Sequence, residues 1–271
     1  MHNVKPPEID ELNSLLLDQI TPLPMIAARQ SAMRQGLMSR VAGNLAKQAG
    51  FLTVRAKHGA WQALKPGIRV KQLWQGRQGS SVLIEFAPGA SLMPHRHNWL
   101  EEGIVLSGEL QMAELHLGPL DYHVSPPGSR HAPISSKHGA LAYLRGTSIG
   151  DNANILLEVI GGMLPFGKDN SRSVFAHEQE AWLPVAAGVE KKILGTADER
   201  TSAFYRFAAG GRLLGQSHGL EQEYMLLAGD AFMDDTLLRA GDYRLAPAGS
   251  RHEEIFSDVG AVIFMRGAGE D

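Results

Sequence analysis

The stretch that decides the fold runs from residue 89 to residue 108 and reads Gly-Ala-Ser-Leu-Met-Pro-His-Arg-His-Asn-Trp-Leu-Glu-Glu-Gly-Ile-Val-Leu-Ser-Gly. His95 and His97 are two residues apart, so on an extended strand both imidazoles project from the same face. Glu101 follows closely enough to add a carboxylate oxygen. Two imidazoles and a carboxylate within one short apolar stretch are typical of a metal site.

A fourth ligand is expected from the stretch Pro126-Pro127-Gly128-Ser129-Arg130-His131. A turn rich in proline and glycine can deliver a histidine back across a neighbouring strand. We therefore predict one site for a divalent transition metal, with the ligands His95, His97, Glu101 and His131. This donor set suits Fe(II), Mn, Ni, Cu or Zn, and the sequence does not choose among them.

Both stretches resemble the signature motifs of the cupin superfamily. The first motif is matched with every spacing kept at Gly89, His95, His97, Glu101 and Gly108. The core of the second is matched by Pro126-x-Gly128-x-x-His131. The chain departs from the family at Leu120, where a glycine is usual, and this leaves the turn entering that strand open to question.

The rest of the architecture follows from an internal repeat. At an offset of 121 residues the chain aligns with itself without a gap, from Ala60-Trp61 on Ala181-Trp182 to Arg145-Gly146 on Arg266-Gly267. Short apolar stretches separated by Gly, Pro, Asp and Ser turns indicate antiparallel strands in each copy. We predict an all-β bicupin: two tandem cupin (double-stranded β-helix, jelly-roll) barrels with a short α-helical N-terminal segment. The expected boundaries are 1–58 for the helical segment, 59–165 for the first barrel and 166–271 for the second.

Outside the barrels, apolar spacing predicts helices over residues 8–20 and 25–48. The apolar stripe of the second helix is expected to dock on a barrel or to form a dimer contact. In the connection between the barrels, residues 155–160 are expected to form a strand and residues 161–173 a loop. The aromatic pairs that recur in both copies are expected to pack in the core, namely Trp61 and Trp182, Phe86 and Phe207, and Tyr122 and Tyr243.

The second copy keeps only part of the proposed site. His95 aligns with Gln216 and Glu101 with Gln222, whereas His218 and His252 are retained. Glutamine is a poor ligand for transition metals, so we expect the second barrel to bind no metal. The alternative is that Glu221 or Glu223 rotates in to complete a weaker site.

The adjacent carboxylates Glu101 and Glu102 cannot both enter the barrel, because neighbours on a strand point to opposite faces. The family spacing selects Glu101, and its loss together with His95 in the second copy supports a common role. Glu102, which is repeated as Glu223, is then expected to be a structural carboxylate that pairs with Arg130. An apolar rim suited to an organic substrate is expected from Met93, Trp99 and Leu100, and surface or turn positions are expected for His116, His123 and His138.

The 271 residues are enough for one large domain or two smaller ones. The absence of cysteine excludes disulfides, thiolate zinc sites and cysteine nucleophiles, and it fits a reducing compartment. We find no secretion signal and no apolar run of about eighteen residues, so we expect no membrane association and a cytoplasmic location.

Charge is uneven although the net charge is only −3. Residues 19–84 contain no Asp or Glu, and their basic residues are scattered without an aromatic stacking platform. We therefore do not expect a nucleic-acid partner. The basic segment is expected to face acidic residues of its own chain or of a second subunit in a homo-oligomer.

Within the cupins, the order Trp61, Pro66-Gly67, Lys71-x-Leu73 and the Phe-Ala-Pro-Gly-Ala of residues 86–90 resembles the cupin domain of the ChrR anti-sigma factors. In that family a helical domain with a His/Cys zinc site holds the sigma factor. This chain has no cysteine with which to build that zinc site. The resemblance therefore implies the metal-binding cupin and argues against a sigma factor as partner.

Two functions fit this resemblance, each with a small-molecule ligand or substrate. One is a metal-dependent enzyme, most simply an Fe(II) dioxygenase like the related cupins that cleave carbon–carbon bonds of small carbonyl or phenolic compounds. The other is a ChrR-like metal- or ligand-responsive sensor without catalysis. An open coordination position beside an apolar pocket favours the enzyme, and a closed tetrahedral site favours the sensor.

Overall fold

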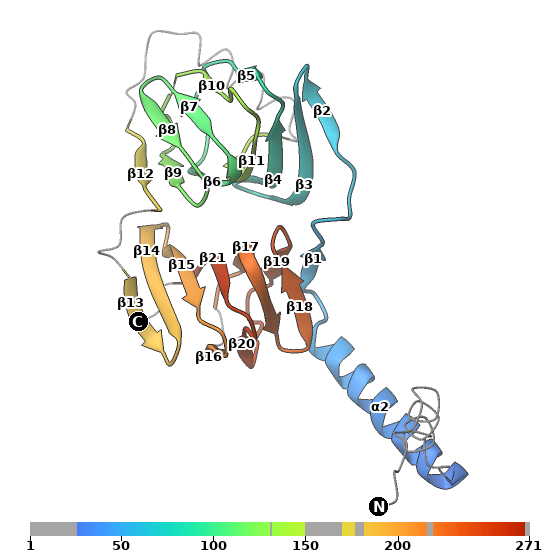
Figure 1. The fold of residues 1–271 in the computed structure, drawn as a ribbon. Coiled ribbons are helices and arrows are strands. Elements are labelled where there is room, and N and C mark those ends of the chain that lie inside the picture. Colours follow the sequence, from blue (N-terminus) through green and yellow to red (C-terminus); the bar gives the residue numbers. More distant parts are fainter. Residues whose placement is uncertain (1–25, 131, 150–169, 177–181, 216–218, 269–271) are drawn as a thin grey trace, which may run out of the picture. The chain divides into compact units, whose positions relative to one another are not determined.

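A computed structural model describes residues 26–130, 132–149, 170–176, 182–215 and 219–268 of the chain, which divides into two units, residues 1–49 and 50–271. In the first unit, helix α2 spans Ala27–Lys47, as predicted for residues 25–48 (Figure 1). Strong helix formers dominate it, and the positive φ of 87° at Gly50 is typical of a residue that follows a helix end. The helix predicted at 8–20 lies outside the described residues, and the partner of the α2 apolar stripe stays a prediction. Across the described residues, no helix is both long and apolar enough to span a membrane.

The first barrel is built entirely from antiparallel strands. They are β2 (Gln62–Lys65), β3 (Ile68–Gly76), β4 (Gly79–Phe86), β5 (Ser91–Leu92), β6 (Glu101–Gly108), β7 (Leu110–Met112), β8 (Leu115–Leu117), β9 (Tyr122–Ser125), β10 (Ile134–Ser135) and β11 (Ala140–Thr147), together with β12 (Arg172–Val174). The larger sheet has the order β12-β9-β6-β11-β4-β3-β2, and the smaller has the order β5-β10-β7-β8. Between them lies an apolar core that includes Ile84, Phe86, Val105 and Leu117.

The second barrel repeats this plan. Its strands are β13 (Trp182–Ala186), β14 (Val189–Ala197), β15 (Arg200–Phe207), β16 (Arg212–Leu214), β17 (Gln222–Met233), β18 (Thr236–Arg239), β19 (Tyr243–Ala246), β20 (Glu254–Phe256) and β21 (Ala261–Ala268), together with β1 (Leu52–Val54). The main sheet has the order β1-β19-β17-β21-β15-β14-β13, which matches the order of the first barrel strand by strand. The prediction of an all-β fold with two tandem cupin barrels is confirmed.

The two barrels exchange their first strands (Figure 1). Strand β1 precedes the first barrel in sequence but pairs with β19 of the second, whereas β12 precedes the second barrel and pairs with β9 of the first. The predicted loop at 161–173 is therefore wrong at its end, because Arg172 begins β12. Residues 161–169 and the strand predicted at 155–160 lie outside the described residues.

Glu102 points away from Glu101 and is buried where the two barrels meet, with 1% of its surface exposed. It accepts hydrogen bonds from Tyr122 at 2.7 Å and from Ser202, and it forms an ion pair with Nε of Arg266 at 2.8 Å. The predicted pairing with Arg130 is wrong. The second barrel covers this face of the first barrel, and its side chains contact the Glu102 carboxylate.

Glu223 has the same environment with the barrels interchanged. Nε of Arg145 donates to it at 2.9 Å, and the hydroxyls of Ser81 and Tyr243 donate at 2.5 Å and 2.8 Å. An apolar layer surrounds both carboxylates and contains Leu73, Leu83, Ile104, Tyr122, Tyr143, Leu194, Phe204, Met225, Leu227, Tyr243, Leu245 and Phe264. Each barrel thus sends one buried carboxylate to an arginine of the other.

Most of the recurring aromatic residues pack as predicted. Phe86, Phe207, Tyr122 and Tyr243 are buried. Trp61 and Trp182 are only partly buried, and each lies under a guanidinium group, that of Arg69 at 5.0 Å and that of Arg206 at 4.4 Å from the ring centroid.

Within the basic segment, Arg55 and Lys71 contact the chain's own polar groups. Arg55 pairs with Asp242 at 2.8 Å, and the Lys71 amine donates to the carbonyls of Arg55 and Ala56 at 2.9 Å and 2.8 Å. For Arg55 the expected contact with an acidic residue of the same chain is confirmed, whereas Lys71 donates to backbone carbonyls of the basic segment itself.

Leu120 keeps the turn that a glycine makes in the second copy. Its φ is 67°, close to the 86° of Gly241 at the matching position. The backbone N–H of each residue donates at 2.8 Å to the matching strand carbonyl, Val105 in one barrel and Leu226 in the other. Leu120, which replaces the usual glycine, therefore adopts a strained left-handed backbone conformation, but the turn itself is unchanged.

We expect Gly241→Ala to destabilise the protein. The left-handed conformation costs a residue with a side chain about 1–2 kcal/mol, and a Cβ at this position would also lie 3.0 Å from that of Ala56. Gly210→Ala is the matched control, since its φ is 80° and no atom lies within 4 Å of an added Cβ. Urea unfolding should give the larger loss for Gly241→Ala, and equal losses would show that the Ala56 contact contributes nothing.

Candidate metal centre

The two histidines of the first motif lie on the loop between β5 and β6. They flank Arg96, which forms an isolated antiparallel bridge with Arg130. The N–H of His97 donates to the carbonyl of Ser129 at 3.0 Å, and the N–H of Gly128 donates to the carbonyl of His97 at 2.7 Å. The segment is therefore a single bridge within a loop and not the regular strand that was expected.

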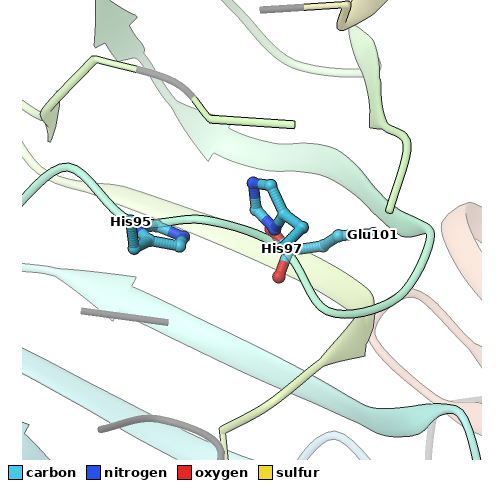
Figure 2. Close-up of side chains that lie close together, drawn as sticks. All are labelled: His95, His97 and Glu101. Carbon is cyan, nitrogen blue, oxygen red and sulfur yellow. The ribbon is translucent and has the colours of Figure 1, made fainter. Parts of the chain in front are cut away.

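His95, His97 and Glu101 come together in the first barrel (Figure 2). One ligand atom from each lies within 4.8 Å of the others, and Nδ1 of His97 is 3.7 Å from Oε1 of Glu101. Ligand atoms that share one metal at about 2.0–2.2 Å lie at most about 4.4 Å apart, so small side-chain rotations suffice to bind an ion. His97 and Glu101 are buried, with 2% and 8% of their surfaces exposed. The predicted fourth ligand, His131, lies outside the described residues.

A cavity of about 240 Å³ adjoins this cluster, and His95 and Glu101 form part of its wall. Its other lining residues are Leu64, Lys65, Leu92, Met93, Ile134, Leu144, Thr147 and Ile149. Of the predicted apolar rim, Met93 lines the cavity, whereas Trp99 and Leu100 are not among the described lining residues. Leu64 and Ile149 come from segments distant in sequence, so spacing alone gave no sign of them. The cavity is mostly apolar, with the acidic and basic groups confined to a few positions.

A smaller cavity of about 40 Å³ lies deeper in the barrel and shares Glu101, Ile134 and Leu144 with the first. Gly103, Val105 and Ala142 are among its apolar lining.

His123 also lines the inner cavity, which makes the surface or turn position expected for it wrong. It lies on β9, and its Nδ1 is 2.9 Å from the hydroxyl of Ser173 on the exchanged strand β12. Because the strand that carries Ser173 comes from the sequence before the second barrel, the first motif gave no indication of this neighbour.

The other two extra histidines are peripheral, as predicted. His116 forms an exposed pair with Glu109 at 2.7 Å, and His138 is exposed.

In the second barrel, a tyrosine occupies the corresponding region. Tyr224 is almost fully buried, and its hydroxyl donates to Oε1 of Gln222 at 2.7 Å and lies 2.7 Å from Nε2 of His252. Burial raises the pKa of the Tyr224 hydroxyl well above its ordinary value, so the hydroxyl stays protonated. Gln216 and His218 lie outside the described residues.

The acidic neighbours of Gln222 do not complete a site. Glu223 points to the junction between the barrels, where it pairs with Arg145, and Glu221 lies 3.7 Å from Arg200. The alternative in which one of them supplies a metal ligand is therefore not supported.

Two antiparallel barrels with a His-His-Glu cluster in the first define the protein as a bicupin. The model of the ChrR cupin-like domain matches residues 50–148 and 170–269, and the chain belongs to this family. A search of curated protein sequences found no match.

Solved structures show the same two-barrel fold. A candidate dioxygenase from Nostoc punctiforme is 13% identical with a TM-score of 0.59, and the match covers 80% of this chain and 81% of that one. Oxalate decarboxylase from Bacillus subtilis, which has Mn(II) centres, is 15% identical with a TM-score of 0.57, with coverage of 81% and 78%. At these identities the likeness establishes the fold alone.

Proposed function

We propose that the protein is a metal-dependent dioxygenase of the Fe(II) type that acts on a small carbonyl or phenolic compound. The observation that carries this proposal is the clustering of His95, His97 and Glu101 beside a mostly apolar cavity whose wall includes His95 and Glu101. Two histidines and one carboxylate with open coordination positions are the donor set of non-haem Fe(II) oxygenases. Zn, Mn and Ni are the other ions that this donor set would accept, with one ion per chain.

His131 completes the proposed ligand set as the histidine of the second motif, in the stretch Pro126-x-Gly128-x-x-His131.

The bound metal would supply Lewis acidity and a template for dioxygen and the substrate. The chain's own residues then have separate tasks. Glu101 balances part of the ion's charge, and the leucine and isoleucine side chains of the cavity exclude water from the substrate. Lys65 donates one hydrogen bond to the Ser91 carbonyl at 2.6 Å, which leaves two ammonium hydrogens for an anionic oxygen of the substrate.

The second candidate is a ChrR-like sensor whose metal is mainly structural. The cavity beside the cluster favours the enzyme, because a structural metal is usually enclosed by its protein ligands. The named neighbours, a candidate dioxygenase and a manganese decarboxylase, are also consistent with catalysis. We further propose a cytoplasmic homo-oligomer with domains at 1–58, 59–165 and 166–271.

Oxygen uptake tests this function. Protein loaded in turn with Fe(II), Mn, Ni or Zn is offered a panel of small diketones and phenols. We expect metal-dependent oxygen consumption with at least one compound and none with apoprotein. Full metal loading without oxygen consumption on any compound would favour the sensor.

A further inference from the structure

A further cavity, here called the junction cavity, lies where the two barrels meet. Its volume is about 630 Å³, and its described lining residues include none of the proposed metal ligands. The first barrel contributes Arg145 of β11 and the hairpin between β3 and β4. The second contributes the hairpin between β14 and β15 and the two residues that precede β17, Leu220 and Glu221. The cavity is therefore built by both barrels and is separate from the metal centre.

Opposite charges are balanced on the lining of the junction cavity. Three guanidinium groups and three carboxylates contribute to it, those of Arg77, Arg145, Arg200, Asp198, Glu199 and Glu221. A simple anion would meet the carboxylates as well, and a simple cation would meet the guanidinium groups. A ligand that carries both charges can place each one beside its opposite.

Arg200 and Glu221 form a loose ion pair at the cavity. Nη2 of Arg200 lies 3.7 Å from Oε1 of Glu221, which is longer than a hydrogen bond, although only 19% and 30% of the two side chains is exposed. Nε of Arg200 is buried and has no hydrogen-bond partner among the described residues. Buried N–H groups are normally hydrogen-bonded, so this guanidinium group has bonding capacity left for a ligand. Arg145, by contrast, already donates to Glu223 at 2.9 Å.

Two further carboxylates stand at the tip of the β14–β15 hairpin. Ala197 pairs with Arg200, so Asp198 and Glu199 form a two-residue turn, and both are exposed. Their φ angles are 52° and 60°, a left-handed conformation that Asn and Gly usually supply in such turns. The chain thus accepts backbone strain where it presents negative charge to the cavity, which is consistent with a functional role for this turn.

Two apolar side chains give the junction cavity a surface suited to a hydrocarbon group. They are Leu220 and Trp74, whose six-membered ring packs over Gly76. In the repeat, Trp74 matches Gly195, where an added Cβ would lie 2.7 Å from Nη2 of Arg172. A guanidinium group therefore covers the matching position of the second barrel, so the aromatic surface is a feature of this side of the junction.

We propose that the junction cavity binds an α-amino acid with an apolar side chain. The carboxylate of the amino acid accepts hydrogen bonds from Arg200, for which the planar guanidinium group is well suited. Its ammonium group donates to Glu221, and its side chain contacts Trp74 and Leu220. This binding site does not depend on the proposed metal chemistry, because the two sites share no described residue.

L-Phenylalanine is the probe, and two analogues separate its charges. Titration calorimetry should detect phenylalanine binding to metal-free protein, in which no bound ion can be chelated. 3-Phenylpropionate lacks the ammonium group and phenethylamine lacks the carboxylate, so each should bind at least about tenfold more weakly. An analogue that binds as tightly as phenylalanine would overturn the doubly charged ligand, and no binding of phenylalanine would overturn the site.

Variants of the full chain locate the binding. Arg200→Gln and Glu221→Gln should each weaken phenylalanine binding by about tenfold or more. Leu220→Trp introduces the residue that the first barrel has at this position and changes no charge; it should weaken binding by narrowing the cavity. The matched control is Arg206→Gln, since Arg206 lies on the same strand but pairs with Glu190 at 2.7 Å, and it should bind like wild type. Melting curves without ligand check that each variant is folded, and binding that folded cavity variants retain would overturn the inference.

Discussion

Replacing Glu101 by glutamine should lower the affinity for a divalent transition metal by at least about 100-fold. Even residues that only orient metal ligands are worth about 10–100-fold, and Glu101 supplies the one carboxylate of the cluster. Glutamine keeps the shape but loses the negative charge that balances the ion. Metal content after dialysis and competition with a chelator measure the effect.

The matched pair His131→Ala and His252→Ala localises the metal to one barrel. His131→Ala should lower the metal content, whereas His252→Ala should leave it unchanged, because His252 is hydrogen-bonded to Tyr224 in the second barrel. A similar loss in both variants would contradict a single site. Wild-type protein that binds none of Fe(II), Zn, Mn or Ni would contradict the metal centre itself.

Glu223→Ala should lower the free energy of unfolding by about 3–5 kcal/mol. The substitution leaves the buried guanidinium of Arg145 without the carboxylate that it contacts at 2.9 Å, and removing one partner of a buried ion pair typically costs this much. Urea unfolding measures the loss. The control is Glu85→Ala, which removes an exposed ion pair with Arg69 and should cost much less, because solvent screens such a pair. Equal losses would contradict a stabilising junction between the barrels.

The same carboxylate predicts how stability depends on pH. Burial by itself raises the pKa of Glu223, but Arg145 and the hydroxyls of Ser81 and Tyr243 outweigh it, so the pKa lies below its ordinary 4.5. A lowered folded-state pKa means that the stabilisation is complete above about pH 4.5 and is lost as the pH falls through the folded value. Between pH 7 and pH 3 wild type should therefore lose more unfolding free energy than Glu223→Gln, and parallel pH curves would contradict this.

The choice between Glu101 and Glu102 could be made from the sequence. Alternation along a strand lets only one of the two carboxylates enter the barrel, and the family spacing, with the joint loss of His95 and Glu101 in the second copy, selects Glu101. The structure agrees, with Glu101 at the cavities and Glu102 at the junction. The partner of Glu102 could not be predicted in this way. Arg266 lies far along the chain and approaches only because the second barrel packs against the first.

The predictions for His123 and for residues 172–174 are wrong for the same reason: both positions are decided by strand pairing. His123 lacks ligand spacing, yet strand pairing puts it opposite Gly103 and therefore on the inner cavity. Residues 172–174 read as part of a loop because three residues carry little periodic signal, and they become a strand by pairing with β9.

The sequence alone determined that the chain contains two copies of one cupin module, that the first copy keeps the His-x-His and Glu motif, and that the second has lost it. These features consist of residue types at fixed spacings, so recognising them requires no knowledge of distant contacts. Only the tertiary structure decided that the barrels exchange their first strands, that buried carboxylates cross between them, and that Tyr224 fills the place of the lost site. Each of these depends on which surfaces pack together, and packing joins residues that the sequence keeps far apart.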